Sequence, residues 1–488
     1  MARKLAVLLH RQWVSGKGVV AIGCQCNCSS PQIITGRGTS ELAPSLPTFV
    51  GCIFPPSTEN SAWKIIMTTA VIPTPQSATA ESAIDSEQTT CSIVGGGPGG
   101  MMLALLLARK RVRVTLLEAH KDFDREFRGD TLHPSVLEIL DEIGLAEPLH
   151  KLRHVKIYGP TLRAANTSFN PIDLRRLKTK FPYIMLIPQT KFLEFIADEA
   201  SKYPEFRLKM TANVESLIEE NGRIRGVRYL SIDGWHEVRA VLTVGADGRF
   251  SKVRHLGGFE PIKTSPPMDI LWFRLPHMPE DPQEDSGRVR GGFANGRMLA
   301  VFDRFDYWQV GYVFPKGTYQ DLRAAGLGAL RDSIVAIEPQ FAKHVDSLTD
   351  WHQFSLLSVE SSRCPRWYKS GLLLIGDAAH VMSPVGGVGI NYAIQDATVA
   401  ANILAIPLRT GQVRVSDLAK VQSKREWPTR IIQAIQSAVQ KRIIASVFRS
   451  PNATRIPTLV PLLFRIPVIR DIPARLIAFG IHPAHVAE

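Results

Sequence analysis

The feature that most constrains this chain is a glycine cluster, GGGPGG at residues 95–100, placed between two apolar runs. The run before it, at residues 91–94, predicts a short strand, and the run after it, at residues 101–110, predicts a buried helix. A further apolar run at residues 112–118 predicts a second strand, parallel to the first. A strand, a glycine turn, a helix and a second strand form a βαβ unit, which favours a doubly wound α/β fold.

The glycines of this cluster have the spacing Gly-x-Gly-x-x-Gly, and each position has a physical reason. Gly95 allows the tight turn, Gly97 lets the backbone approach a pyrophosphate, and Gly100 lets the helix pack close to the strand. The helix N-terminus offers N–H groups to phosphates, and Glu118 can accept hydrogen bonds from ribose hydroxyls. The pattern predicts a dinucleotide site, with a glycine-rich turn beside a surface acid as the simpler alternative. The predicted cofactor-binding residues here are Gly95, Gly97, Pro98, Gly99, Gly100 and Glu118.

Two later segments repeat the pattern of an apolar run that ends in a polar turn. In the first, Asp247 and Gly248 follow the run AVLTVGA, although Asp-Gly alone is a common turn pair. In the second, the run LLLIG delivers Asp377 at its carboxyl end, where ligands bind in open α/β sheets. A carboxylate there suits a polyhydroxy chain. The glycines of VGGVG at residues 385–389 permit close backbone approach at the start of the next helix, whose N-terminus favours an anionic group.

Together these three motifs resemble the p-hydroxybenzoate hydroxylase family of FAD-dependent monooxygenases, over roughly residues 90–405. In that family the first motif holds the ADP part of FAD, and the second binds the pyrophosphate. The third contacts the ribityl chain and the pyrimidine side of the isoalloxazine. Arg128, after the second strand, and Gln189, at the start of a later helix, resemble residues that reach the cofactor. The resemblance therefore adds as cofactor-binding residues Arg128, Gln189, Asp247, Gly248, Asp377, Pro384, Gly386, Gly387, Gly389 and Asn391.

The resemblance implies that NAD(P)H, a transient co-substrate, reduces FAD, and that one oxygen atom of O2 then passes to an electron-rich aromatic, polyketide-like or terpenoid-like small molecule. A flavin-dependent reductase or dehydrogenase of a prenyl or quinone lipid shares the three motifs and is the main alternative. A binding or scaffold protein with a vestigial flavin site is a third interpretation. We expect neither a metal site nor a nucleic-acid partner.

The sequence supplies no convincing protein nucleophile or catalytic base, so the catalytic residues remain unknown. His380 is a candidate because it follows the Gly-Asp-Ala-Ala run, and packing against the turn is its simpler role. His133 is a candidate because it lies on the loop that enters the helix predicted to begin at Pro134, where it would face the ring or the substrate. A wall of aromatic and charged side chains would suit a planar substrate, and ordinary sheet packing explains the same residues equally well. The candidates for this wall are Trp272, Arg274, Tyr307, Trp308 and Tyr312.

The predicted fold is a Rossmann-like FAD-binding domain with an inserted antiparallel sheet and a helical C-terminal extension. Residues 1–88 are Ser-, Thr-, Pro- and Gly-rich and predict a disordered extension, with Met67 as a hypothetical alternative start and ordered chain from Thr90. The FAD-binding domain is predicted from residues 89–155, 185–262 and 365–408. The substrate domain is predicted from residues 156–184 and 263–364, and a helical region repeatedly broken by prolines from residues 409–488.

The formal net charge is +13, and much of the excess lies after residue 408, where 13 Lys and Arg face four acidic residues. A basic, partly apolar C-terminal region can contact an anionic membrane surface, or it can pack over the rear of the active site or on a dimer partner. The cysteine motif CQCNC at residues 24–28 lacks a second ligand cluster, so it does not predict a zinc site. We expect a cytoplasmic location, with peripheral membrane contact as the alternative.

Overall fold

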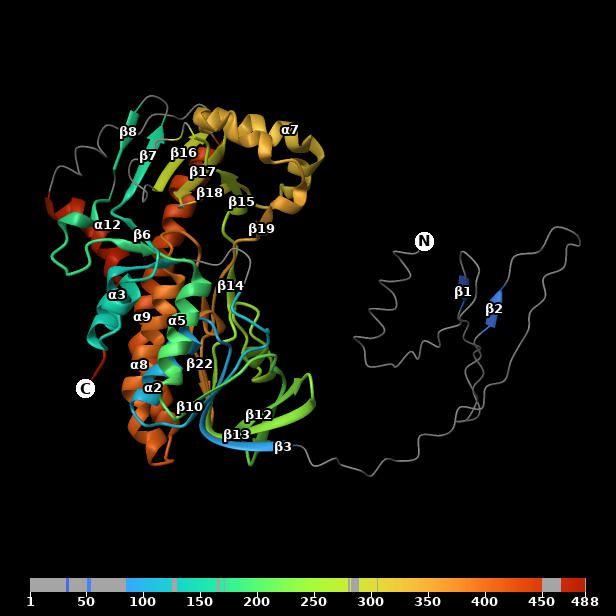
Figure 1. The fold of residues 1–488 in the computed structure, drawn as a ribbon, viewed down its shortest axis with the longest axis vertical. Coiled ribbons are helices and arrows are strands. Elements are labelled where there is room, and N and C mark those ends of the chain that lie inside the picture. Colours follow the sequence, from blue (N-terminus) through green and yellow to red (C-terminus); the bar gives the residue numbers. More distant parts are fainter. Residues whose placement is uncertain are drawn as a thin grey trace, which may run out of the picture. The chain divides into compact units, whose positions relative to one another are not determined.

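The computed structural model describes residues 32–34, 51–53, 85–124, 130–164, 167–170, 172–279, 281, 289–304, 306–449 and 467–487. The chain divides into two units, Met1–Ser82 and Ala83–Glu488. In the first, β1 (Gln32–Ile34) pairs antiparallel with β2 (Gly51–Ile53). The CQCNC motif and most of the predicted N-terminal extension lie outside the described residues. Everything that follows concerns the second unit (Figure 1).

The second unit is built around an eight-stranded mixed sheet. Five of its strands run parallel to one another. One of these five is also the long last strand of an antiparallel three-stranded meander. In order across the sheet the strands are β10 (Phe206–Lys209), β4 (Val114–Leu117), β3 (Asp85–Val94), β13 (Gly234–Gly245), β12 (Arg223–Ser231) and β11 (Asn213–Glu220), with β22 (Leu372–Leu374) beside the end of β13 and β21 (Tyr368–Lys369) beside β22.

One expectation about this sheet was wrong. The first strand starts at Asp85 rather than at Thr90, because residues 85–90 continue to pair with β13, from His236 onward. The predicted boundary at residue 88 therefore falls inside β3, so the last residues of the predicted disordered extension belong to the sheet.

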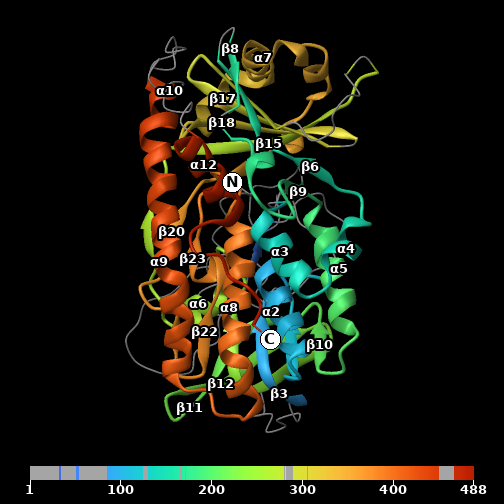
Figure 2. The ribbon, with the colours of Figure 1, turned by 90° about the vertical axis from the view of Figure 1, so that its left-hand side faces the viewer.

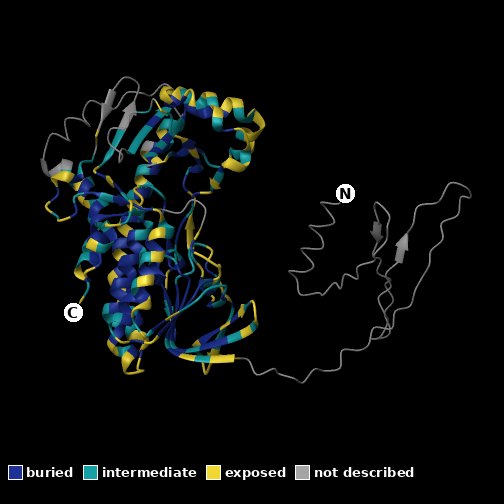
Figure 3. Cartoon of the chain, viewed as in Figure 1, coloured by how far each residue is buried: buried dark blue, intermediate teal, exposed yellow. Residues whose placement is uncertain are grey.

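Four long helices form a layer on one face of this sheet (Figure 2). Their apolar side chains and those of β3 and β4 form the largest core of the second unit (Figure 3). The helices are α5 (Gln189–Ser201), α2 (Pro98–Arg109), α8 (Gly389–Arg409) and α9 (Val415–Val439). The shorter helices α3 (Pro134–Glu142), α4 (Ala146–His150) and α6 (Lys252–Leu256) complete the unit around the sheet.

A second, seven-stranded sheet carries α7 (Tyr319–Ile337) on one face (Figure 1). The strands are, in order, β19 (Ser355–Leu357), β15 (Met268–Pro276), β18 (Tyr307–Pro315), β17 (Arg297–Asp303), β16 (Val289–Ala294), β7 (Pro160–Ala164) and β8 (Thr167–Phe169). Short strands between the two large sheets are β5 (Thr131–Leu132), β9 (Ile184–Leu186), β6 (Val155–Ile157), β14 (Ile262–Thr264), β20 (Ser361–Arg363) and β23 (His380–Val381).

The prediction that prolines break the C-terminal helices was wrong at two positions. Pro428 lies inside α9, and Pro473 lies inside α12 (Pro467–Phe479). A proline inside a helix costs about 3 kcal/mol, and in α9 packing offsets this cost because Pro428 and Ile432 are buried. The hydroxyl of Thr429 also donates to the carbonyl of Arg425 at 2.8 Å.

The C-terminal residues 467–487 pack on the rest of the second unit. Ala474 and Ala478 of α12 pack on Leu174 and Leu177, and the N–H of Ala484 donates to Gln395 at 3.3 Å. Ala474 and Ala478 therefore pack within the chain, and peripheral membrane contact stays a prediction. Within the described ranges, no helix combines the length and the apolar character that crossing a bilayer requires.

Candidate functional site

The three sequence motifs meet at one edge of the eight-stranded sheet. The parallel strands β3, β13 and β22 are adjacent, and Gly245 is in register with both Val94 and Leu374. The N–H of Ala246 donates to the carbonyl of Val94 at 2.8 Å, and the N–H of Ile375 donates to that of Gly245 at 3.0 Å. The turns that follow these strands therefore emerge side by side at their carboxyl ends.

The first glycine turn leaves open space beside its own backbone, where a phosphate group of a ligand would approach. Gly95 has a φ of +104°, and a Cβ there would lie 2.5 Å from the carbonyl oxygen of Ala246, so a side chain is excluded. A Cβ on Gly97 would meet no atom of the described part of the chain within 4 Å. Among the described residues, no side chain caps the N-terminus of α2, and its first turn holds no acidic residue. Free N–H groups beside an open glycine suit a phosphate.

Glu118 holds this turn from behind. Its Oε2 accepts from the N–H of Gly96 at 2.8 Å, and its Oε1 accepts from the N–H of His120 at 3.0 Å. The side chain is 6% exposed. The carboxylate thus fixes the glycine turn in addition to the sugar-binding role that its position predicts.

The second motif forms a capped turn that braces the third. Asp247 accepts from the Ser251 hydroxyl at 2.5 Å and from the N–H of Val253 at 3.0 Å. Burial raises the pKa of Asp247 above its ordinary value, although these hydrogen bonds oppose the shift. Arg254 donates to the carbonyls of Asp377, at 3.3 Å, and of Ala378. The second motif therefore contributes to the position of Asp377. A Cβ on Gly248 would meet no atom within 4 Å.

The third motif ends in an exposed glycine turn at the start of α8. The N–H of Gly387 donates to the carbonyl of Pro384 at 3.0 Å, and Gly386 and Gly387 have φ values of +83° and +63°. The amide of Asn391 fastens this turn to the β5 segment. It donates to the carbonyls of Thr131 and Gly387, both at 3.2 Å. As at α2, no side chain caps α8 and no acid lies in its first turn.

His133 is buried directly behind this turn. Its backbone N–H donates to Oδ1 of Asn391 at 2.8 Å, and its ring Nδ1 lies 2.6 Å from the carbonyl oxygen of Ile477 in α12. Because a carbonyl can only accept, Nδ1 carries the proton and Nε2 presents a lone pair. Burial lowers the pKa of His133 from 6.5 to about 4. Nε2 has no hydrogen-bond partner among the described residues, and it lies 3.7 Å from the Cβ position of Gly387.

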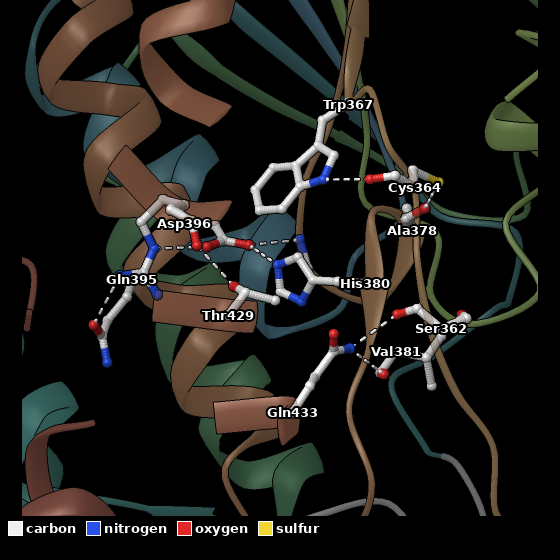
Figure 4. Close-up of polar contacts among 12 residues, drawn as sticks. Ser362, Cys364, Trp367, Ala378, His380, Val381, Gln395, Asp396, Thr429 and Gln433 are labelled. Carbon is white, nitrogen blue, oxygen red and sulfur yellow. Dashed lines mark hydrogen bonds and ion pairs between the residues drawn. The ribbon is translucent and has the colours of Figure 1, made fainter. Parts of the chain in front are cut away.

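His380, the second candidate, belongs to a buried polar core (Figure 4). Its Nε2 donates to Asp396 at 2.6 Å, and Arg425 of α9 donates to the other oxygen of Asp396 at 2.8 Å. Asp396 also accepts from the N–H of Gly376 at 3.0 Å. His380 and Arg425 hold the pKa of Asp396 below its ordinary value, although burial, the largest single influence, acts in the opposite direction. Figure 4 shows Trp367 beside His380, with ring centroids 4.8 Å apart.

This core supports the turn that carries Asp377. Asp396 accepts hydrogen bonds from Gly376, the residue before Asp377, and from His380, which follows shortly after it. His380 is 1% exposed. These contacts place His380 in the support of the turn and favour the packing role over a catalytic one.

A polar seam that the sequence did not predict, formed by Asp130 and Arg304, joins the β5 segment to the seven-stranded sheet. Asp130 precedes β5, and it accepts from the guanidinium of Arg304, at the turn between β17 and β18. Its other oxygen accepts from the N–H of Gln189 at 3.1 Å. Arg304 also donates through Nε to Gln309 of β18 at 2.9 Å. The seam thus reaches Gln189, one of the predicted cofactor residues, whereas Arg128 lies outside the described residues.

The predicted aromatic wall is divided between the two faces of the seven-stranded sheet. Trp308 and Tyr312 are buried under α7, where the Tyr312 hydroxyl lies 2.8 Å from that of Ser333. Strand alternation puts Trp272, Arg274 and Tyr307 on the opposite face. On that face Trp272 lies over Gly311, which has no side chain to displace it.

An apolar cluster on this opposite face reaches the third motif. Trp272 lies 6.0 Å from Phe302, centroid to centroid. Trp272, Met298 and Val385 of the glycine turn all pack against one buried apolar cluster, whose members are Met268, Ile270, Val313, Val359 and Ile444. This face of the seven-stranded sheet and the glycine turn of the third motif therefore share one apolar cluster. Phe302 and Met298 were not predicted, because alternation alone does not say which face of a strand meets the site.

Comparison with known proteins identifies the class. The chain belongs to the family described as "FAD binding domain", whose model matches residues 88–432. It is 34% identical over 400 residues to a 6-methylpretetramide 4-monooxygenase of Streptomyces rimosus, covering 81% of this chain and 93% of that protein. It is therefore an FAD-dependent monooxygenase, as the motifs predicted. The open glycines and the uncapped helices fit the phosphates and ring of FAD.

Two further matches are weaker. OxyS anhydrotetracycline hydroxylase from Streptomyces rimosus has the same fold, with a TM-score of 0.64 at 22% identity, covering 80% of this chain and 76% of that chain. A digeranylgeranylglycerophospholipid reductase of Methanosarcina acetivorans is 23% identical over 346 residues, covering 68% of this chain and 79% of that protein. The Rossmann-like α/β fold with an inserted sheet is confirmed.

Proposed function

We propose that this enzyme hydroxylates a planar, fused-ring aromatic or polyketide-like molecule with NAD(P)H as electron donor. The observation that carries the substrate class is the pair of rings Trp272 and Phe302 on the face of the seven-stranded sheet whose apolar cluster also receives Val385 of the third motif. Flat aromatic side chains pack on flat aromatic ligands. The similarity to a 6-methylpretetramide monooxygenase supports the same class of substrate.

The proposed binding roles follow the geometry of the three motifs. The N–H groups at Gly97 and the start of α2 hold the pyrophosphate, and Glu118 accepts hydrogen bonds from the adenosine ribose. Asp377 accepts from the ribityl hydroxyls. The N–H groups at the start of α8 face the pyrimidine edge and stabilise negative charge on the reduced ring. Asp247 and Asn391 act by holding these turns in place, because their contacts are made within the protein.

FAD supplies the redox chemistry when bound: it takes electrons from NAD(P)H and activates O2. The overall reaction consumes one substrate C–H bond, NAD(P)H, a proton and O2, and it gives one C–OH bond, NAD(P)+ and water. The protein holds the substrate against the apolar surface and keeps water away from it. No described side chain is required as a nucleophile.

The test is oxygenation under 18O2 of a panel of phenols with two, three and four fused rings, with 6-methylpretetramide as the four-ring member. Purified holoenzyme and either NADH or NADPH would be analysed by mass spectrometry. We expect one 18O atom in the product of a multi-ring phenol. Reduced product without 18O would contradict the proposal and support the prenyl-lipid or quinone reductase alternative. A protein that binds no FAD would support the scaffold alternative.

A further inference from the structure

The seam between Asp130 and Arg304 has features that stability alone does not explain. Arg304 is 6% exposed, and the Asp130 side chain is 17% exposed. Taking both charges out of water costs as much as their attraction returns, so an apolar pair of similar size would stabilise the fold as well. Burial is the largest influence on Asp130, and it raises the pKa of this carboxyl despite the attraction of Arg304 and Arg274.

The location of the seam is specific. Asp130 is fixed on its own side by the N–H of Gln189 and, through its carbonyl, by the N–H of Ile187 at 2.9 Å. Arg304 is fixed on the other side by Gln309. Register puts Gln309 on the same face of the sheet as Trp272 and Gly311, since it pairs with Arg274. The seam therefore links a predicted cofactor residue to the aromatic face of the seven-stranded sheet.

The groups around the seam define a geometric constraint. A guanidinium donates in fixed, planar directions, so a pair with a carboxylate specifies orientation as well as distance. Asp130 directly precedes β5 of the three-stranded sheet, and Arg304 directly follows β17 of the seven-stranded sheet, 174 positions later. A small rotation of one sheet against the other would separate them. Oxygen transfer requires the reacting atoms to be aligned within fractions of an ångström.

We propose that Asp130 and Arg304 are positioning residues that set the aromatic face of the seven-stranded sheet against the flavin-binding turns. The inference rests on the proposed function, and it assigns the choice between productive and wasted turnover to this pair. When the face is misplaced, NAD(P)H, a proton and O2 yield NAD(P)+ and H2O2, and the substrate C–H bond stays intact. Gln309 and the N–H of Gln189 hold the two partners in place.

The test compares Asp130→Asn, Arg304→Gln and the double variant Asp130→Leu/Arg304→Met as holoenzymes. The double variant is informative because replacing both charges removes the penalty of an unpaired buried charge. The melting temperature of the double variant should therefore lie within about 3 °C of that of the wild type. With the panel phenol that the wild type oxygenates best, the H2O2 formed per NAD(P)H should rise ~10-fold in all three variants. This change corresponds to about 1.4 kcal/mol in the relative barriers of oxygen transfer and peroxide release. FAD content should be unchanged.

Arg304→Lys tests rescue, since lysine keeps the charge and loses the planar donor geometry. We expect partial recovery of coupling. Lys316→Met is the matched control, because Lys316 and Asp269 form a 2.9 Å ion pair within the seven-stranded sheet. Its peroxide yield should equal that of the wild type. A double variant that recovers both stability and coupling would overturn the proposal, because the pair would then serve stability only.

A second measurement needs no substrate and separates failure of this inference from failure of the proposed function. Quenching of FAD fluorescence by iodide reports access of solvent to the ring in each holoenzyme. Loosening the seam should raise the quenching constant at least ~2-fold in the double variant and leave it unchanged in Lys316→Met. Equal quenching constants in the double variant and the wild type would overturn the positioning role of Asp130 and Arg304, whatever the substrate is.

Discussion

Asp396 is a buried carboxylate and Asp130 a partly buried one; each is held by an arginine, yet they join different parts of the molecule. Asp396 is 0% exposed, and all its partners belong to the helical layer and the third motif. Asp130 links the β5 segment to the seven-stranded sheet. The partners lower the pKa of Asp396, whereas burial raises that of Asp130. The same pair of residue types therefore secures one turn in the first region and the relation between two sheets in the second.

The largest expected effect separates these two regions by stability. Asp396→Ala leaves Arg425 charged and without its carboxylate in a closed core, which should cost about 3–5 kcal/mol of unfolding free energy. Asp130→Ala should cost about 1–3 kcal/mol, because the seam lies at a boundary that water can reach after the change. Urea unfolding of both variants measures the difference. Equal losses would break the comparison.

The next effect concerns His133, which is buried against α12. Its folded pKa of about 4 lies below its ordinary 6.5, so the unfolded chain binds more protons between these values. Stability should therefore fall as pH drops from 6.5 to 4, by up to ~3 kcal/mol, and then level off. His133→Gln removes the ionisable group and should flatten this part of the curve. Unfolding at a series of pH values, with FAD in excess, provides the check. An unchanged slope in the variant would contradict the burial argument.

A third change leaves both aspartate pairs intact and acts on the cofactor alone. Gly97→Ala adds a methyl group where the protein has free space, so the apoprotein should melt as the wild type does. The methyl group would obstruct the pyrophosphate, and FAD affinity should fall ~10–100-fold, or about 1.4–2.7 kcal/mol. Titration of apoprotein with FAD measures this.

Gly328→Ala in α7 is the control for that change, since its Cβ also meets no atom within 4 Å. It should leave FAD affinity unchanged. A similar loss of affinity in both variants would mean that the first glycine turn is not the phosphate site.

The smallest effect is a difference in sign. Because the folded pKa of Asp130 is raised, its contribution to stability should decrease as pH rises from its ordinary 3.8 through the raised value. Asp396 should behave oppositely, losing its contribution as pH falls below 3.8. Comparing the wild type with Asp130→Asn over mildly acidic pH isolates the first contribution. A variant that is less stable than the wild type by the same amount at every pH would contradict it.

The sequence predicted the parts of the site that local chemistry determines. Glycines at fixed spacing after apolar runs located the three turns, and Asp377 and Glu118 followed from the ends of strands. The sequence did not reveal the Asp130–Arg304 pair, because nothing local connects residues 174 positions apart. It also assigned Trp308 and Trp272 to one wall, since alternation in a strand separates two faces without saying which one is covered by α7.

The shared strand β13 has a consequence for how the chain folds. One end of this strand pairs with β12, and the other pairs with β22, whose residues follow the whole seven-stranded sheet in the sequence. During synthesis, the end of β13 nearest the cofactor turns has no neighbour on that side until β22 leaves the ribosome. Such long-range parallel pairing is slow, and an open strand edge invites aggregation. Recombinant yield should therefore respond more to slower translation and added chaperones than to changes in the promoter.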